Sequence, residues 1–199
     1  MNFLKPILFG AAFALSSCGG TPDLYPVTPP KAVEAQRIAF RAVEVRDVSL
    51  PTYASANEIA VENLDGKLVT DAAVLWADSP ERAVALELTR HLAQITGARV
   101  APEPWPFEAF PDARLDVRFE SLIASADGQL RASGQFFVSV ADGRRERSGL
   151  FDLSVPFAAD AGPKAIAAAR GTRTLAGLKK IAKEVRDAGY NPSVHGDGH

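Results

Sequence analysis

The stretch RLDVRFESLI, from Arg114 to Ile123, has the most regular alternation of polar and apolar residues in the chain. Successive side chains of a β-strand point to opposite faces, so a period of two predicts a strand with one buried and one solvated face. The other face carries interleaved opposite charges, which is typical of a solvated, charge-paired sheet surface; a partner surface is the alternative. The expected buried face holds Leu115, Val117, Phe119, Ser121 and Ile123.

Two more segments with this period follow, at 130–140 and 145–157. Short turns containing Asp127-Gly128 and Asp142-Gly143 separate the three segments. Asp-Gly favours tight hairpin turns, because glycine readily adopts a positive φ. The sequence therefore predicts a three-stranded antiparallel meander.

Shorter β-like segments precede the meander, at 37–48 (with a bend near Ala42), 58–62, 67–70 and 99–101. The second and third flank Asp65-Gly66 and predict a hairpin. We expect Pro51 to end the first segment, because proline cannot donate to a strand ladder.

Two helices are expected, one beginning at Ser79-Pro80 and ending at Gly97, the other covering 163–188. Serine is a favoured N-cap, proline suits the first helical position, and glycine suits the C-cap. His91 is expected to be half-exposed beside the apolar stripe. The apolar stripe of the first helix is Val84, Leu88, Leu92 and Ile95. The fold class is therefore α/β of the α+β type: a single domain with a mostly antiparallel sheet, a three-strand meander in its C-terminal half, and two long helices on one face.

Composition limits the function. Hydrophobic residues make up 47% of the 199 residues, which is enough for a core, and the formal net charge is -2. A nucleic-acid partner would call for a clustered basic surface, and the sequence has none, so we expect no such partner.

The chain begins with Lys5, a short apolar run at 7–15 and the only cysteine, Cys18. The run fits the apolar region of a signal peptide and is too short to span a bilayer. Leu15-Ser16-Ser17-Cys18 resembles the bacterial lipobox, whose cysteine is lipidated and becomes the mature N-terminus. An ordinary signal peptide with a chance cysteine is the alternative, but Cys18 has no disulfide partner. We therefore expect a covalent lipid, such as palmitate, on Cys18.

The expected organisation is a lipoprotein signal peptide at 1–17, a Pro-rich tether at 18–35, a domain at 36–190 and a disordered tail at 191–199. Within the tether, Leu24-Tyr25 could dock on the domain as an extended piece. The residue after Cys18 is Gly19 and not the aspartate that commonly retains such lipoproteins in the inner membrane, so the resemblance favours the outer membrane over the inner.

Motifs that carry chemistry are absent from the sequence. It has no HExxH, no nucleophile elbow and no Gly-rich phosphate-binding loop. We expect no catalytic residue, no metal site and no cofactor other than the lipid. Aromatic and proline residues at strand ends remain, and they either cap the core or form a partner-binding surface. These residues are Leu50, Pro51, Tyr53, Trp76 and Trp105.

The order of motifs resembles the PqiC (paraquat-inducible protein C) lipoprotein family, also called the ABC-type transport auxiliary lipoprotein component, from Leu24 to Ala188. The usual Trp-x-Glu-x-Leu signature of that family is replaced here by Trp76-Ala77-Asp78-Ser79-Pro80. The motifs that carry the resemblance are the lipobox, Tyr25-Pro26, Val45 with Leu50-Pro51 and Tyr53, the Asp-Gly hairpin, Trp76 before a helix, and Pro104-Trp105.

The resemblance implies a non-enzymatic envelope lipoprotein on the periplasmic face of the outer membrane. Such proteins bind the end of an MCE-domain tunnel protein, which carries lipids between membranes and supports membrane integrity. That partner belongs to an inner-membrane complex, in some systems with an ABC ATPase. The family is also similar to ring-forming proteins, so homo-oligomers are expected. A periplasmic adaptor for another outer-membrane assembly and an envelope hydrolase remain as alternatives.

Overall fold

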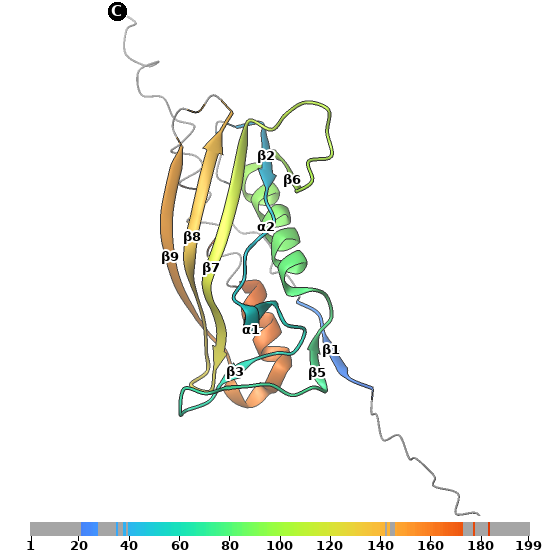
Figure 1. The fold of residues 1–199 in the computed structure, drawn as a ribbon, viewed down its shortest axis with the longest axis vertical. Helices are drawn as coiled ribbons and strands as arrows, with labels where there is room; N and C mark the ends of the chain where they lie inside the picture. The colour runs from blue at the N-terminus through green and yellow to red at the C-terminus, as the bar shows by residue number, and fades with distance from the viewer. Residues whose placement is uncertain are drawn as a thin grey trace, which may run out of the picture.

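The computed structural model describes residues 21–27, 35, 38, 40–141, 143, 146–172, 177 and 183. The expected signal peptide, Cys18 and the tail at 191–199 lie outside the described residues, as does most of the second expected helix. Figure 1 shows an elongated domain with a curved sheet on one side and helices packed against it.

The meander is confirmed. Strands β7 (Ala113–Ser125), β8 (Gln129–Val140) and β9 (Arg147–Pro156) pair antiparallel in that order. Gly128 has a φ of 76° and Gly143 one of 65°, so both turns use the positive φ that Asp-Gly favours.

A β-bulge interrupts β7, because its register on β8 shifts between Phe119 and Ser121. The extra residue reverses which side chains face the core. Leu122 packs against the core, whereas Ile123 lies opposite Arg131 on the outer face. The expectation that Ser121 and Ile123 share the buried face is therefore wrong.

The edge of β7 away from β8 pairs with parallel strands, which the local sequence patterns do not predict. At one end of β7 lies β2 (Ala42–Val45), which also pairs parallel with β6 (Arg99–Pro102). At the other end lies β3 (Val61–Glu62), which forms the expected antiparallel hairpin with β4 (Leu68–Val69). The sheet is thus mixed, with its long antiparallel pairs in the C-terminal half.

Helix α2 (Pro80–Thr96) and the helical residues 162–172 cover the same face of the sheet. Leu88 and Leu92 of α2 pack with Leu115 of β7, and Ile166 packs with Leu130 of β8. The described residues also contain two short elements, α1 (Thr52–Ser55) and the 3-10 turn η1 (Ala159–Ala161).

The ends of α2 lie where the sequence predicts them. Pro80 occupies the first turn after Ser79, although the Ser79 side chain makes no capping hydrogen bond, and Gly97 caps the C-terminus with a φ of 69°. His91 is fully buried, with 0% exposure, so the expectation of a half-exposed histidine is wrong. His91 lies three residues after Leu88 and four before Ile95, which places it within the buried stripe itself.

The N-terminal strand β1 (Asp23–Tyr25) pairs parallel with β5 (Val74–Trp76) in a separate two-stranded sheet. This pairing confirms that Leu24-Tyr25 docks on the domain as an extended piece. Asp23 donates its backbone N–H to the Ala73 carbonyl at 2.7 Å, so the docking begins at the first residue of β1.

Candidate functional site

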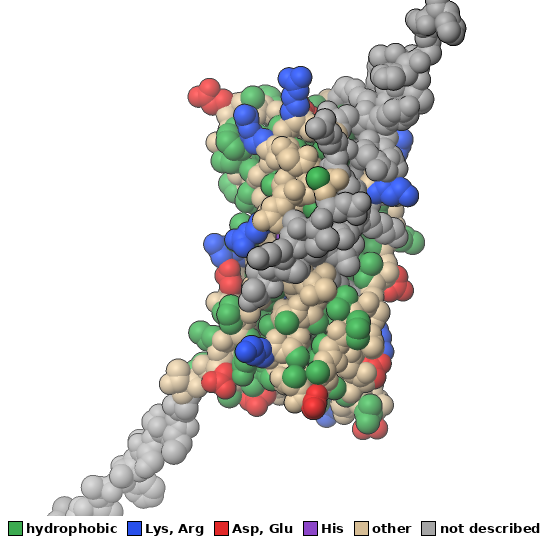
Figure 2. Space-filling model, turned by 180° about the vertical axis from the view of Figure 1, so that it is seen from behind, with side chains coloured by type: hydrophobic (Ala, Val, Ile, Leu, Met, Phe, Trp, Pro, Cys, Tyr) green, Lys and Arg blue, Asp and Glu red, His purple; other side chains and the backbone are tan. Residues whose placement is uncertain are grey.

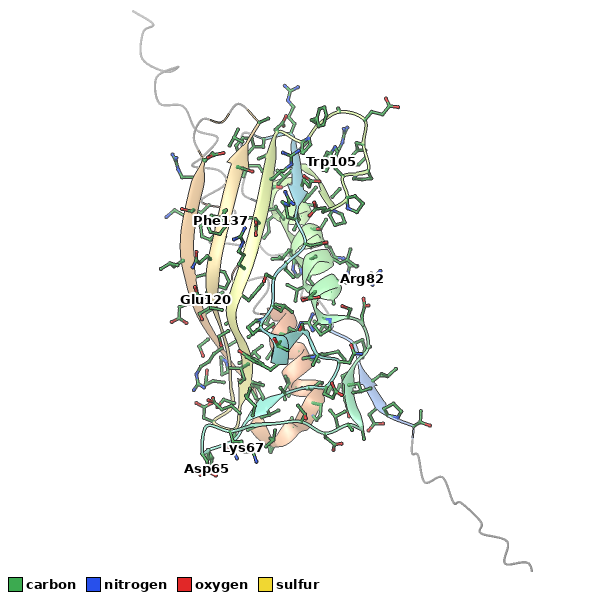
Figure 3. The ribbon with its side chains drawn as sticks, in the orientation of Figure 1. Asp65, Lys67, Arg82, Trp105, Glu120 and Phe137 are labelled. Atoms are coloured by element: carbon green, nitrogen blue, oxygen red, sulfur yellow. The ribbon has the colours of Figure 1, made fainter. Side chains whose placement is uncertain are left out.

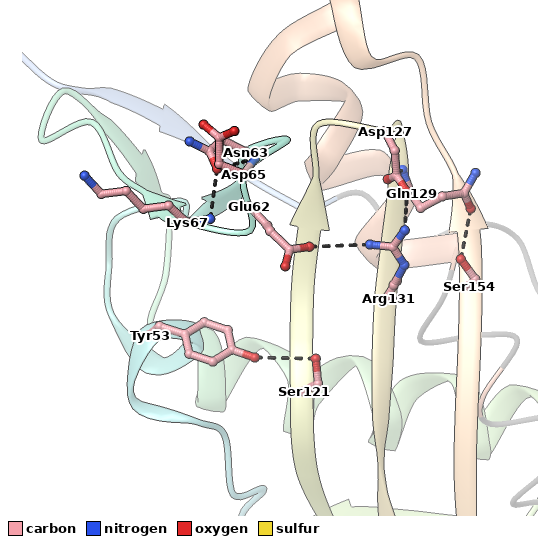
Figure 4. A network of polar contacts seen from close by, with 10 residues as sticks. All are labelled: Tyr53, Glu62, Asn63, Asp65, Lys67, Ser121, Asp127, Gln129, Arg131 and Ser154. Atoms are coloured by element: carbon pink, nitrogen blue, oxygen red, sulfur yellow. Dashed lines mark hydrogen bonds and ion pairs between the residues drawn. The ribbon is translucent and has the colours of Figure 1, made fainter.

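Tyr53 fills a gap in the sheet. Between Phe119 and Ala124, no strand among the described residues pairs with the β2 and β3 edge of β7. Tyr53 Oη accepts a hydrogen bond from the Leu122 N–H at 3.3 Å and donates one to Ser121 Oγ at 3.5 Å (Figure 4). The tyrosine hydroxyl therefore takes the place of a missing strand carbonyl.

Leu50 and Pro51 position this tyrosine. Leu50 packs against the main core, and Pro51 precedes the first residue of α1 with its carbonyl accepting the N–H groups of Ala54 and Ser55. A proline before α1 ends the extended segment and starts the turn that brings Tyr53 to β7.

Trp76 makes a cation–π contact with Arg170, which lies in the helical residues 162–172, called the last helix below. The guanidinium carbon of Arg170 lies 4.7 Å from the centroid of the Trp76 ring. Arg170 is only 3% exposed; its Nη2 donates to the Pro80 carbonyl at 3.2 Å and lies 3.6 Å from Glu87 Oε1. Burial lowers the pKa of Arg170, and the charge of Glu87 opposes that shift. This cluster joins β5, α2 and the last helix.

A cleft of ≈ 330 Å³ opens beside this cluster, between the β1–β5 sheet and α2. A second, larger groove of ≈ 490 Å³ follows α2 toward β6. Leu86 borders both and is 38% exposed. Neither the cleft nor the groove can be predicted from the sequence, because each is lined by elements distant in the chain. Residues around the first cleft include Tyr25, Trp76, Glu87, Arg90 and Arg170.

Trp105 lies in a different part of the molecule, in residues 103–112 between β6 and β7, which we call the aromatic loop (Figure 3). Its ring packs edge-on against Phe107 with the centroids 5.0 Å apart, and its Nε1 donates to the Ala109 carbonyl at 2.6 Å. The Arg99 guanidinium lies 5.1 Å from the Phe107 ring. Phe110 is 84% exposed and is not among the residues predicted to bind a partner.

The five candidate partner-binding residues therefore do not form one surface. Tyr53 and Trp76 border the same small pocket, Leu50 packs against the core, and Trp105 lies at the opposite end of the domain from the β3–β4 hairpin. Partner binding by any of them stays a prediction.

The outer face of the sheet is charge-paired, as the alternation in β7 predicts. Arg114 Nε lies 2.7 Å from Glu44 Oε2 on β2, and Arg118 Nη2 lies 2.9 Å from Asp116 Oδ2. The Asp116 carboxylate raises the pKa of Arg118 through a side-chain hydrogen bond. Arg118 also lies over the Phe137 ring at 5.0 Å.

Within the described part of the chain, no group of three or more His, Cys, Asp or Glu side chains could hold a metal ion. None of the described helices has the length and apolar character needed to cross a bilayer. On the face seen in Figure 2, basic and acidic side chains are dispersed, with the acidic ones mainly on the lower half.

A family model described as the ABC-type transport auxiliary lipoprotein component matches residues 23–182. The fold is similar to the crystal structure of an uncharacterized protein, with a TM-score of 0.67 and 20% identity over 83% of this chain and 99% of that one. It is also similar to protein XCC0632 from Xanthomonas campestris, of the DUF330 family model, with a TM-score of 0.63 and 16% identity over 84% of this chain and 96% of that one. No curated protein matches the chain.

Proposed function

The chain belongs to the ABC-type transport auxiliary lipoprotein component family, and on this basis we propose that it docks a periplasmic MCE-domain tunnel protein at the outer membrane. The family is an auxiliary transport component of the cell envelope and not an enzyme class, so its partners are transporter components. The observation that carries the proposal is the family match, which spans nearly the whole described domain.

The anchor in this proposal is a lipid on Cys18, and the outer membrane is its site because Gly19 follows the cysteine. Each acyl CH₂ buried in a bilayer contributes about 0.8 kcal/mol, and stable anchoring takes two chains or a second signal. Diacylglycerol on the sulfur, with a further acyl chain on the new N-terminus, meets that requirement.

The partner surface in this proposal is the aromatic loop. Phe110 is 84% exposed and Phe107 is 42% exposed, beside the half-buried ring of Trp105. Aromatic residues, phenylalanine among them, are enriched at protein interfaces. The Trp105 hydrogen bond to Ala109 and the Phe107 contact give the loop a defined shape, which lowers the entropic penalty of binding.

The test is affinity capture of the lipidated full-length protein, with its bound proteins identified by mass spectrometry. We expect an MCE-domain protein and its inner-membrane complex. Phe110→Ser should reduce that capture strongly, whereas Leu150→Ser, at a 68% exposed position on β9, should not. Capture of a different outer-membrane assembly in place of an MCE protein would contradict the proposal.

A further inference from the structure

The docking of β1 shortens the effective tether. Asp23 is already hydrogen-bonded to Ala73, so only the chain between Cys18 and Asp23 separates the proposed lipid from the folded domain. Five residues can span at most about 18 Å when fully extended. If Cys18 carries the lipid, the end of the domain where β1 begins must lie close to the bilayer.

The β3–β4 hairpin lies at this same end. Figure 1 shows β1 entering the domain at the lower end, beside β5 and below α2, and β3 at the lower end of the sheet. Asp65 and Lys67, in the hairpin turn, mark the lowest part of the sheet in Figure 3, opposite Trp105. The aromatic loop leads directly into Ala113, the first residue of β7, while β3 pairs at the other end of that strand.

Exposed apolar side chains are concentrated at this lower end. Leu64 at the hairpin tip is 86% exposed, Leu68 is 39% and Val69 is 43%, and Leu24 of β1 is 58% exposed. Together they make up half of the large hydrophobic residues exposed in the described part of the chain. Exposed apolar groups of this kind are stabilised by contact with a lipid surface.

The hairpin presents Leu64 from an ordered turn. Asn63 Oδ1 accepts the backbone N–H groups of Asp65 at 3.0 Å and Lys67 at 2.8 Å, and Gly66 supplies a φ of 77° (Figure 4). Glu62 Oε2 lies 3.5 Å from Arg131 Nη1 on β8, which ties the base of the hairpin to the sheet. The direction in which the tip projects is therefore set by the fold.

Charge does not drive this contact. Around β1, the hairpin and the β7–β8 turn, the acidic Asp23, Glu62, Asp65 and Asp127 outnumber the basic Lys67 and Arg131, so an anionic lipid surface would not attract this end. The short tether must therefore bring the hairpin close to the bilayer. The apolar side chains at the hairpin tip then contact the lipid.

From this geometry we propose that the β3–β4 hairpin, with Leu64 at its tip, rests on the membrane that holds Cys18. The inference rests on the proposed lipidation of Cys18. The long sheet then stands upright on the membrane. The twelve steps along β7, at about 3.3 Å each, carry the aromatic loop about 40 Å away from the bilayer surface.

The test uses the lipidated full-length protein in vesicles of phosphatidylethanolamine and phosphatidylglycerol. Cys18 is the only cysteine, so once it is acylated an introduced cysteine is the sole reactive thiol. Leu64→Cys and Phe110→Cys are a matched pair, because the two side chains are 86% and 84% exposed at opposite ends. Each thiol carries an environment-sensitive fluorophore, and a fraction of the vesicle lipid carries a nitroxide quencher.

We expect loss of fluorescence for the Leu64→Cys label and no loss for the Phe110→Cys label. Insertion of twelve Gly and Ser residues between Gly20 and Thr21 should abolish the quenching at position 64. Equal quenching at both positions, or no quenching at either, overturns the inference.

Mass spectrometry of the N-terminus shows whether Cys18 is acylated. Failure of the proposed orientation can then be told apart from failure of the proposed anchor. An acylated Cys18 without quenching at position 64 overturns the orientation and leaves the proposed anchor intact. An unmodified Cys18 on a protein that fails to sediment with vesicles overturns both.

Discussion

Arg170 lies over the indole of Trp76 at 4.7 Å and thereby joins the last helix to β5, although 94 positions separate the two residues in the chain. The guanidinium also lies 3.6 Å from Glu87 Oε1 and donates to the Pro80 carbonyl, so one buried cation bonds to both the start and the middle of α2. The cluster is a joint between three elements that surround the cleft beside α2.

Arg170→Ala should destabilise the domain by about 3 kcal/mol, because it removes one partner of a buried ion pair together with the hydrogen bond to the Pro80 carbonyl. Urea unfolding followed by circular dichroism measures the change. The double variant Glu87→Leu with Arg170→Met should recover much of the loss. If Arg170→Ala is as stable as the parent protein, the Arg170–Glu87 pair contributes nothing to the free energy of unfolding.

Tyr53→Phe should lower the free energy of unfolding by about 1 to 2 kcal/mol, because it leaves the Leu122 N–H without the acceptor it has at 3.3 Å. Hydrogen exchange of the Leu122 amide should become faster while the amides of α2 are unchanged. Ser154→Ala removes an exposed hydrogen bond to Gln129 and should change stability by less than about 0.5 kcal/mol. Unaltered exchange at Leu122 would mean that another group satisfies this amide.

Gly134→Ala should prevent stable folding or reduce stability by about 4 kcal/mol, a loss typical of severe core clashes. A Cβ at this position would lie 2.1 Å from the Arg118 carbonyl oxygen and 2.8 Å from the Phe151 ring. Gly143→Ala is the comparison, because its Cβ would meet nothing within 4 Å and only the positive φ of 65° is unfavourable. Thermal unfolding of both variants measures the difference; similar melting temperatures would contradict the close approach of β7 and β8.

Cys18→Ala should move the protein from the membrane fraction to the soluble periplasm, since the proposed lipid is the anchor. Gly19→Asp should leave it lipidated and shift it toward the inner membrane. Sucrose-gradient separation of the two membranes with immunoblotting measures both. Retention of Cys18→Ala in the outer-membrane fraction would show that another feature anchors the chain.

The elements whose signals are local can be predicted from the sequence. The alternation in β7, β8 and β9, the Asp-Gly turns, and the Pro80 and Gly97 ends of α2 all lie where residue patterns predict them, because strand period, turn geometry and capping depend on neighbours along the chain. The lipobox and the resemblance to the family are also properties of the linear sequence, and the family match agrees with that resemblance.

Features that depend on contacts between distant residues are visible only in the folded chain. The bulge at Phe119 and Ser121 reversed the buried face of β7, because one extra residue shifts a period of two. The parallel pairing of β2 with β7 and the placement of Arg170 over Trp76 required contacts far apart in sequence. The pairing of β1 with β5 also needs hydrogen bonds between distant segments, and the proposals of a short tether and a membrane-facing end rest on it.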